Sequence, residues 1–431
     1  MSIEKFDVIV VGAGPSGLAA AYVAAKAGLK VIVFERGEYP GNKNVMGGVF
    51  YRNCLDDLIP GFWKEAPLER HIIEQGIWLL SEEGAVKSTH RNDRFAKEPY
   101  NCFTVLRAKF DRWFSTKVRE AGALIICETV VEELIEEKGK VVGVRTGRAG
   151  SEVRADLVIL SEGVNSILTR KAGLRGDIPA NQLAVGLKEV MFLPKEKIQD
   201  RFQVNDGEGV AFEFFGEFTK GMGFGFIYTN KESLSVGVGV LLSHIVESKL
   251  NPNDILEAMK SHPSIKPLLE GAVPKEYLAH LVPEGGYKAM PELVKDGLMV
   301  TGDAGMMVNG IHREGSNLAV MSGRMAGETA VLAKQKGDFS RNTLSIYKEK
   351  LANSFVLKDL KKYKDASDLF DHNKYMFSLY PKIANNAAYE MLNVDGLPKR
   401  EKQGRIMKMI TNERSKWGIA KDIWKTWRAL K

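Results

Sequence analysis

The sequence predicts an α/β protein, in which a Rossmann-like nucleotide-binding fold carries an inserted antiparallel sheet and an α-rich carboxyl-terminal region. Three observations support this prediction. A glycine-rich turn joins two apolar strands near the start, the middle of the chain is rich in Phe, Gly and Val, and the residues after 338 read mainly as helices. With 431 residues, the chain exceeds the usual size of a single core. We expect a nucleotide-binding part over 1–180, a substrate domain over 181–290, a return to the nucleotide-binding fold over 291–337 and a helical region over 338–431.

The first unit is predicted as a strand at 7–11, a turn at 12–17, a helix over 18–28 and a second strand at 31–34. Both strands are rich in β-branched residues, as is typical of strands buried on both faces. The helix is rich in alanine and ends at a glycine, a common helix cap. The turn consists of Gly12, Ala13, Gly14, Pro15, Ser16 and Gly17.

The glycines of this turn indicate a dinucleotide site. Gly12 permits the tight turn, Gly14 lets a pyrophosphate approach the backbone, and Gly17 lets the helix pack closely on the strand. Unpaired amides at the helix start attract the pyrophosphate. Glu35, at the end of the second strand, can accept hydrogen bonds from a ribose diol, which argues against a phosphorylated ribose. This unit alone does not distinguish NAD from FAD.

The next segments extend the site. A loop over 36–53 places Arg36, Gly47 and Gly48 near the cofactor. A helix over 107–121 begins at Arg107, whose forked guanidinium can reach a pyrophosphate or form a surface salt bridge.

A strand at 123–127 follows this helix, and then a strand, a turn and a return strand over 128–144. In this last segment we also assign Val130 to the cofactor site.

Two further buried strands end in glycine-containing turns. The strand at 155–161 leads into Glu162 and Gly163, and the strand at 298–300 leads into Gly302 and Asp303, before a helix from about 315 to 334. The Asp303 carboxylate can bond a ribityl hydroxyl, or it can be an ordinary turn aspartate.

In this order, the segments over 6–332 resemble the FAD-dependent family of aromatic hydroxylases, geranylgeranyl reductases and electron-transfer-flavoprotein:quinone oxidoreductases. The resemblance implies bound FAD, with Gly302 and Asp303 at the ribityl chain. It also implies a helix start beside the flavin pyrimidine, where backbone amides stabilise negative charge on the reduced ring. The residues similar to that helix start are Gly315, Ser316 and Asn317. This chain departs from the family at Glu162, where the family usually has Asp. The following glycine matches, so the resemblance assigns Gly163 to the cofactor site.

Within this family, the strings at 223–233 and 276–287 resemble the FixC branch, and the Tyr-x-Trp-x-Phe-Pro signature of geranylgeranyl reductases is absent. The resemblance implies an oxidoreductase that passes electrons from an electron-transfer flavoprotein, with α and β subunits of the FixA and FixB type, to menaquinone or ubiquinone, in a complex that can bifurcate electrons. This electron transfer requires the chain to supply neither a nucleophile nor a metal ligand. Two alternatives stay open: an isoprenoid-lipid reductase, and a flavin-free binding protein on the same fold.

The cysteines predict a partner. Cys54, Cys102 and Cys127 match neither a disulfide framework nor a cluster spacing, and none follows Cys127. The fused relatives hold an iron–sulfur cluster with four cysteines near their carboxyl terminus, so the resemblance implies a separate ferredoxin-like subunit of the FixX type. The cysteine usage fits a reducing, cytoplasmic compartment.

Positive charge is concentrated in the tail. The net charge is +7, and 398–431 hold eleven Lys or Arg against three acids, so we expect no nucleic-acid partner. Apolar residues recur there at near-helical spacing, which predicts a basic amphipathic helix on an anionic membrane surface, at the inner face of the cell membrane, or packed on protein. No window is long and apolar enough to span a bilayer. His312, beside the flavin loop, can steer a proton or be a structural histidine.

Overall fold

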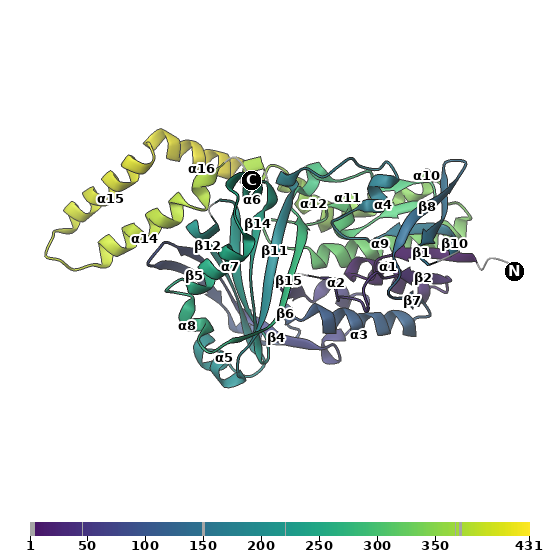
Figure 1. Cartoon of the computed structure of the whole chain (residues 1–431), viewed down its shortest axis with the longest axis horizontal. Coiled ribbons are helices and arrows are strands. Elements are labelled where there is room, and N and C mark those ends of the chain that lie inside the picture. Colours follow the sequence, from purple (N-terminus) through teal and green to yellow (C-terminus); the bar gives the residue numbers. More distant parts are fainter. Residues whose placement is uncertain (1–4, 45, 149–150, 220, 367, 370–372) are drawn as a thin grey trace.

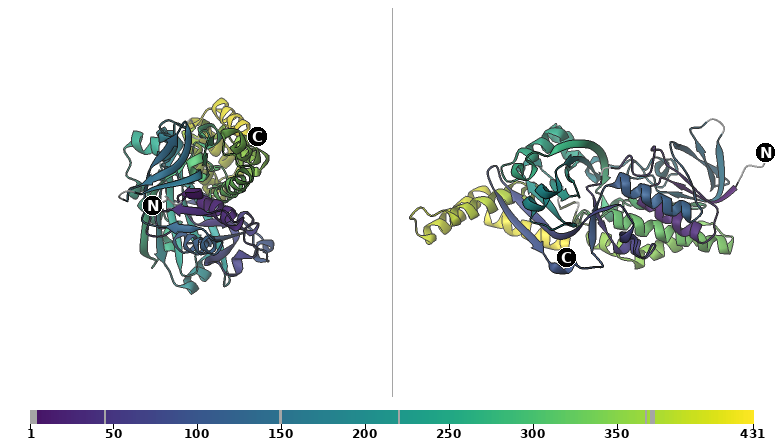
Figure 2. Two further views of the ribbon diagram at one scale, coloured as in Figure 1. Left: turned by 90° about the vertical axis from the view of Figure 1, so that its right-hand side faces the viewer. Right: turned by 90° about the horizontal axis from the view of Figure 1, so that it is seen from below.

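The computed structural model describes residues 5–44, 46–148, 151–219, 221–366, 368–369 and 373–431. Two sheets lie side by side, and a helical arm extends from the second one (Figure 1). The two further views show the same arm standing away from the rest of the chain (Figure 2). The predicted α/β class, with a second sheet and an α-rich end, is confirmed.

The first sheet has the strand order β16-β17-β10-β1-β2-β7. Its β1, β2, β7, β10 and β17 are parallel, β16 is antiparallel to β17, and the β8–β9 hairpin pairs with β10. The strands are β1 (Lys5–Val11), β2 (Val31–Phe34), β7 (Leu124–Ile126), β8 (Val131–Glu137), β9 (Lys140–Thr146), β10 (Glu152–Leu160), β16 (Val294–Lys295) and β17 (Leu298–Val300).

Three helices pack beside this sheet. α1 (Pro15–Lys26) packs closely against α9 (Ser316–Lys336) and also contacts α3 (Arg107–Glu120). The predicted start of the first helix at residue 18 is three residues late, because the end of the glycine turn is already helical, with Pro15 in its first turn. β2 is completely buried and most residues of β1 and α1 are buried, which explains their largely apolar sequences.

The second sheet has the order β15-β11-β14-β13-β12-β4-β6-β3, with β5 paired to β4. The strands within 181–290 pair antiparallel with one another, as predicted, and β12 pairs in parallel with β4, which lies outside that segment. The strands are β3 (Val49–Tyr51), β4 (Leu68–Leu80), β5 (Ala85–Arg91), β6 (Cys102–Val105), β11 (Leu183–Phe192), β12 (Glu208–Gly216), β13 (Gly223–Thr229), β14 (Ser233–Leu241) and β15 (Val273–Pro283).

The strands β3 to β6 also change the predicted domain boundaries. They lie within 1–180, yet they complete the sheet assigned to 181–290, so the two predicted segments share one structural unit. β3 likewise interrupts the predicted loop over 36–53. One side of this sheet packs on α5 (Lys195–Phe202) and α7 (Pro252–Ser261) in a separate apolar core.

A buried arginine links the distant parts of the second sheet. Arg70 in β4 is 1% exposed, and its guanidinium donates hydrogen bonds to four main-chain carbonyls, those of Asn205, Glu208, Asn230 and Lys231. Its Nε–O distance to Asn230 is 2.6 Å, and its Nη1–O and Nη2–O distances to Glu208 and Lys231 are 2.8 and 3.1 Å. The guanidinium therefore ties β4 to the start of β12 and to the β13–β14 turn.

The shorter helices connect or cover these sheets. They are α2 (Asn53–Asp56), α4 (Ile167–Lys171), α6 (Leu242–Ser248), α8 (Lys266–Leu269), α10 (Arg341–Leu344), α11 (Ile346–Asn353) and α12 (Phe355–Lys362).

The helical arm consists of α14 (Leu379–Leu392), α15 (Lys399–Glu413) and α16 (Lys416–Leu430), and α14 rests on β4 and β5. The predicted single amphipathic helix is two helices, with a break at Arg414 and Ser415 where Ser415 caps α16. No helix in the described ranges combines the length and hydrophobicity that a bilayer crossing needs.

Candidate functional site

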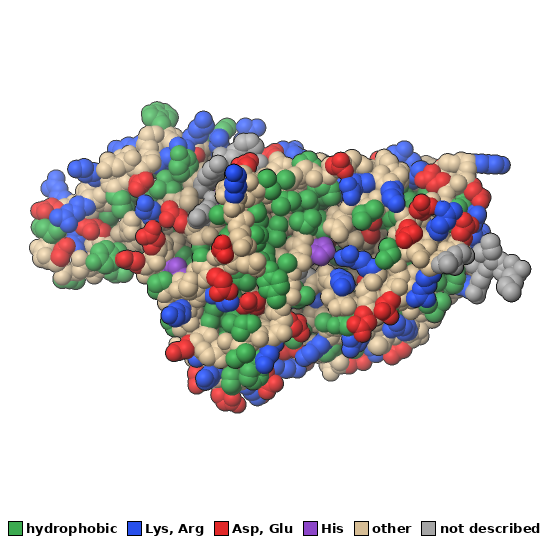
Figure 3. All heavy atoms as spheres, viewed as in Figure 1, with side chains coloured by type: hydrophobic (Ala, Val, Ile, Leu, Met, Phe, Trp, Pro, Cys, Tyr) green, Lys and Arg blue, Asp and Glu red, His purple; other side chains and the backbone are tan. Residues whose placement is uncertain are grey.

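One cavity of about 1060 Å³ lies between the two sheets and is lined by residues of both. In the space-filling view, basic side chains gather beside a hollow between the two halves of the molecule (Figure 3). Most of the predicted cofactor residues line this cavity. They are Gly12, Gly14, Pro15, Ser16, Glu35, Arg36, Gly47, Gly48, Arg107, Val130, Gly163, Asp303, Gly315 and Ser316.

Four predicted cofactor residues do not line the cavity. Ala13 is completely buried, and Gly17 and Gly302 are packing positions, where an added Cβ would meet the Gly12 main chain at 1.9 Å and the Ser16 side chain at 2.9 Å. Asn317 is buried at the start of α9, and its Oδ1 has no hydrogen-bond partner. The structure therefore gives these residues supporting positions rather than cavity-facing ones.

The glycine turn separates packing from ligand access. A Cβ on Gly12 would lie 2.3 Å from the Ser161 carbonyl oxygen, and this residue also has a φ of +100°. Around Gly14, by contrast, nothing lies within 4 Å of an added Cβ, although the residue lines the cavity. Gly12 and Gly17 thus serve the fold, and Gly14 leaves open the space that a pyrophosphate needs.

Two helices begin at this cavity without side-chain caps. The N-cap of α1 is Gly14 and that of α9 is Gly315, and neither helix start has a side-chain hydrogen bond. The first amides of a helix attract negative charge when no side chain satisfies them. A ligand with a pyrophosphate at one end and a ring that becomes anionic on reduction fits these two positions, so the residues present fit FAD.

Two main-chain amides hold the Glu35 carboxylate in place. Its Oε2 accepts a hydrogen bond from the Ala13 amide at 2.9 Å, and its Oε1 accepts one from the Gly37 amide at 2.7 Å. Each carboxylate oxygen has a further lone pair for a ribose hydroxyl. The two amides therefore fix the direction in which this side chain faces the cavity.

Arg107 lines the cavity and forms a salt bridge with Asp111. Its Nε and Nη2 donate to the two oxygens of Asp111 at 2.7 and 2.6 Å, and Nη1 donates to Asn44 Oδ1 at 3.1 Å. The salt bridge is buried rather than on the surface, since the two side chains are 5% and 0% exposed. Burial raises the pKa of Asp111, and Arg107 acts against this rise. Asp111 thus engages Nε and Nη2 of the guanidinium. Nη1 instead faces the loop that contains Asn44, beside the cavity.

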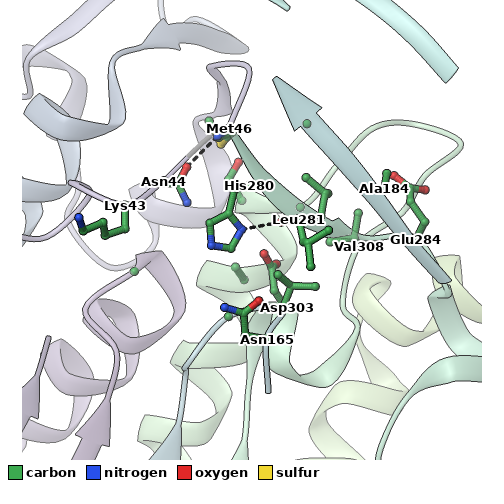
Figure 4. Close-up of a pocket in the computed structure, with 18 of the residues that line it drawn as sticks. Lys43, Asn44, Met46, Asn165, Ala184, His280, Leu281, Glu284, Asp303 and Val308 are labelled. Atoms are coloured by element: carbon green, nitrogen blue, oxygen red, sulfur yellow. Dashed lines mark hydrogen bonds between the residues drawn. The ribbon is translucent and has the colours of Figure 1, made fainter. Parts of the chain in front are cut away.

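Asp303 lies at the centre of the site, near Asn165 and His280 (Figure 4). Burial raises the pKa of its carboxyl group, and the charges of Arg107 and His280 act in the opposite direction. It reaches this position at the turn after β17, where Gly302 adopts a φ of +61°. This is the place that the resemblance assigns to the ribityl contact.

Glu162 has a structural reason for being longer than the family's usual Asp. Its carboxylate accepts hydrogen bonds from the Leu168 and Thr169 amides at 2.9 and 2.7 Å, and from the Thr169 hydroxyl at 2.8 Å. These amides belong to the first turn of α4. The side chain therefore caps α4, and its neighbour Gly163 lines the cavity.

An ion pair that the sequence did not predict involves Arg313, a residue that lines the cavity. Arg313, with a φ of +53°, donates through Nε to Glu213 Oε1. Burial raises the pKa of Glu213 and of the adjoining Tyr228. Glu213 and Tyr228 lie on neighbouring strands of the second sheet, so only the sheet pairing could have brought them together.

The space beside Gly14 leads to a prediction. Replacing Gly14 by Ala leaves the free protein intact, because its φ of −75° suits any residue and no atom is displaced. The methyl group would enter the space that we assign to the pyrophosphate, so we expect FAD affinity to fall about tenfold or more. Flavin titration and thermal unfolding measure the two effects. Gly176→Ala, at an exposed and equally open position outside the cavity, is the matched control. Unchanged FAD affinity in Gly14→Ala would contradict this placement.

Comparison with family models gives two matches along the chain. The model of the ETF-QO/FixC family C-terminal domain matches 366–431, and the model of FAD dependent oxidoreductases matches 7–182.

Among the curated relatives, the chain is 49% identical to the protein FixC of Azotobacter vinelandii, over 99% of both chains. It is 40% identical to a probable electron transfer flavoprotein-quinone oxidoreductase, YdiS, of Escherichia coli, over 97% of both chains.

Among solved structures, a geranylgeranyl bacteriochlorophyll reductase-like protein of Thermoplasma acidophilum matches with a TM-score of 0.73 and 21% identity, over 95% of this chain and 96% of the other. The flavin-dependent brominase Bmp2 matches with a TM-score of 0.67 and 19% identity, over 94% and 93%. These two likenesses concern the fold.

The relatives confirm the sequence-based expectation of FAD and exclude the flavin-free alternative. Together with the geometry of the cavity, they show that this chain is an FAD-dependent oxidoreductase and that it belongs to the FixC family.

Proposed function

We propose that this protein passes electrons from an electron-transfer flavoprotein to a membrane quinone, menaquinone or ubiquinone. The observation that carries the proposal is that one cavity joins the dinucleotide end to an apolar end. The apolar end lies between the second sheet and the end of the helical arm, and its lining includes Phe215, Met222, Phe224, Phe226, Leu281, Phe377 and Leu430.

FAD bound in this cavity supplies reversible two-electron chemistry. The chain holds it with the turn at 12–17, with Glu35 at the ribose, with Asp303 at the ribityl chain and with the amides at the start of α9. The aromatic side chains at the far end exclude water and accept the ring and isoprenoid tail of a quinone. The printed name of the Escherichia coli relative supports this acceptor.

We further propose three protein partners. The electron donor is an electron-transfer flavoprotein with subunits of the FixA and FixB type, and a ferredoxin-like subunit of the FixX type carries the iron–sulfur cluster. The chain has three cysteines, and Cys54 and Cys102 are buried as free thiols, so the four ligands of a cluster have to come from elsewhere. The assembly can bifurcate electrons, and it works in the cytoplasm at the inner face of the cell membrane.

The test is purification with the neighbouring subunits, followed by flavin and iron analysis and a quinone-reduction assay. We expect one FAD in this chain, and reduction of quinone by the reduced flavoprotein donor. Quinone that fails to oxidise the reduced flavin would overturn the proposal. A gain of two hydrogens per double bond in added prenyl lipids would instead favour the isoprenoid-lipid reductase.

The helical arm supplies a prediction for membrane contact. Trp417, Trp424 and Trp427 on α16 are 87%, 54% and 57% exposed, among lysines and arginines. Tryptophan on a basic helix favours an anionic lipid interface. Replacing all three by Ser should therefore remove most binding to vesicles that contain anionic lipid, in a flotation assay, with unchanged thermal unfolding. Neutral phosphatidylcholine vesicles are the control. Equal binding of the wild type and the triple variant to the anionic vesicles would contradict the prediction.

A further inference from the structure

We propose that Glu284 is a catalytic proton donor, which delivers protons to the quinone and receives them from the surface through a second, small cavity. This inference rests on the proposed function, because it assigns the protons of the reaction that the quinone undergoes. Glu284 follows β15 and is one of the residues shared by the two cavities.

The position of Glu284 is fixed by its neighbours. Its amide donates to the Gln182 carbonyl at 2.8 Å, and its carboxylate lies against the loop at 308–311. A Cβ on Gly310 would lie 2.6 Å from Glu284 Oε2, so glycine at that position makes room for the carboxylate. In the close-up, Glu284 lies beside Ala184 and Val308, apart from the group around Asp303 (Figure 4). Met222, which lines the apolar end of the main cavity, also lines the small cavity together with Glu284, so the carboxylate stands at the apolar end.

The small cavity has a volume of about 30 Å³, enough for one or two water molecules. It extends from Glu284 to Tyr363, which follows α12. The Tyr363 hydroxyl is hydrogen-bonded to His312 Nε2 at 3.0 Å, and His312 is exposed to solvent. A chain of titratable or hydrogen-bonding groups thus runs from solvent through His312, Tyr363 and the small cavity to Glu284.

The electrostatic surroundings suit a proton carrier. Burial raises the pKa of Glu284 to about 7, and the positive charge of Arg313 acts against this rise. Arg313 is itself paired with Glu213, which moderates its effect on Glu284. Tyr363 is the titratable group on the opposite wall of the small cavity. A group with a pKa near the working pH both gives up and regains a proton readily.

A further charged group on a neighbouring element is Lys288, from the short helix at 286–289. Its Nζ lies 2.7 Å from Asp365 and 2.6 Å from Asp368, on the exposed side of the molecule. Lys288 is therefore neutralised by these carboxylates, and Arg313 is left as the cation that acts on Glu284.

The proton balance follows from quinone chemistry. A quinone takes up two electrons and two protons to become a quinol, and the reduced flavoprotein donor supplies both electrons. The Glu284 O–H bond breaks as a bond forms between the proton and a quinone oxygen. The resulting carboxylate takes a proton from the small cavity, whose water is resupplied from solvent through Tyr363 and His312. A second delivery protonates the other oxygen, so the net uptake is two protons from solvent.

The test compares the wild type with Glu284→Gln in the complete FAD-loaded complex. We expect quinone reduction to fall about tenfold or more in the variant. The wild-type rate should also fall as the pH rises through about 7, because only the protonated carboxyl group donates, and the variant should lack this dependence. FAD content and the rate of reduction by the flavoprotein donor should be unchanged. Glu83→Gln, at an exposed turn between β4 and β5, is the matched control.

Two measurements separate this inference from a structural role and from the proposed function. Ferricenium accepts one electron without a proton, so Glu284→Gln should reduce it at the wild-type rate. Infrared difference spectra should contain a carboxyl C=O band that titrates near pH 7 in the wild type and is missing in the variant. If the wild type reduces quinone and Glu284→Gln does so at the same rate, only the role of Glu284 is overturned. If the wild type does not reduce quinone at all, the proposed function is overturned.

Tyr363→Phe tests the outer part of the path. It removes the hydroxyl that bonds His312 and keeps the aromatic ring. We expect a slower quinone reduction that small weak acids restore, since they can protonate Glu284 through the cavity. A wild-type rate in this variant would remove Tyr363 from the path.

Discussion

A Gly323→Ala variant is expected to be strongly destabilised and to retain less FAD than the wild type. Gly323 lies where α9 crosses α1, and an added Cβ would lie 1.9 Å from the Ser16 carbonyl oxygen. The obstacle is main chain, which has no rotamer to change. α9 therefore has to move away from α1, and this movement disturbs the bond from the Gly302 amide to Ser322 Oγ, which is 3.0 Å long. We expect a loss of about 3 kcal/mol or more in the free energy of unfolding.

The same substitution at Gly404 is the matched control. Gly404 lies inside α15, and nothing is within 4 Å of an added Cβ there. Alanine in an open helix position stabilises by about 1 kcal/mol relative to glycine, so the two variants should differ in sign. Denaturant unfolding and flavin content measure both. If Gly323→Ala and the wild type have the same free energy of unfolding, then α9 can move away from α1 without destabilising the protein, and the prediction is wrong.

Replacing Arg107 by Met should destabilise the protein by about 3–5 kcal/mol, because Asp111 would be left buried without its partner. The burial that raises the pKa of Asp111 would then act alone. A carboxyl group whose folded pKa is raised loses stability as the pH rises from its unfolded pKa through its folded pKa. The variant should accordingly be less stable at pH 8 than at pH 5, relative to the wild type, in denaturant unfolding.

The double variant Arg107→Met with Asp111→Leu separates stability from cofactor binding. Removing both charges from a buried site recovers most of the stability. If Arg107 also contacts FAD through Nη1, flavin titration of the double variant should still give about tenfold or more weaker binding. Recovery of both stability and FAD affinity would assign Arg107 a purely structural role.

The local parts of the fold were predictable from the sequence. β1, β2 and α3 lie within two residues of their predicted bounds, because apolar runs, glycine caps and helical spacing act over short distances. β4 was not predicted, since its sequence Leu-Glu-Arg-His-Ile-Ile-Glu-Gln-Gly-Ile-Trp-Leu-Leu mixes charged and apolar residues. The buried Arg70 guanidinium bonds only to carbonyls more than a hundred residues away, and Glu69 accepts a hydrogen bond from the Lys231 amide, which is equally distant.

The same limit applies to the site. The sequence placed Gly14, Glu35 and Asp303 because each follows a strand whose end faces the cofactor. It could not show that Asp111 occupies the Arg107 fork. Nor could it show that Glu284 meets the loop before α9, because that contact depends on how the second sheet packs on the first.

The parallel pairing of β12 with β4 has a consequence for synthesis. β4 ends at residue 80, and its partner begins at residue 208. At about 5 to 20 residues per second, the nascent chain carries β4 without that neighbour for on the order of 10 s. During this interval the strand edge and its apolar side chains are open to other chains, and the closing contact has high sequence separation, which slows folding. The yield of the protein in a cell therefore depends on the pace of translation and on chaperone supply, as well as on the stability of the finished fold.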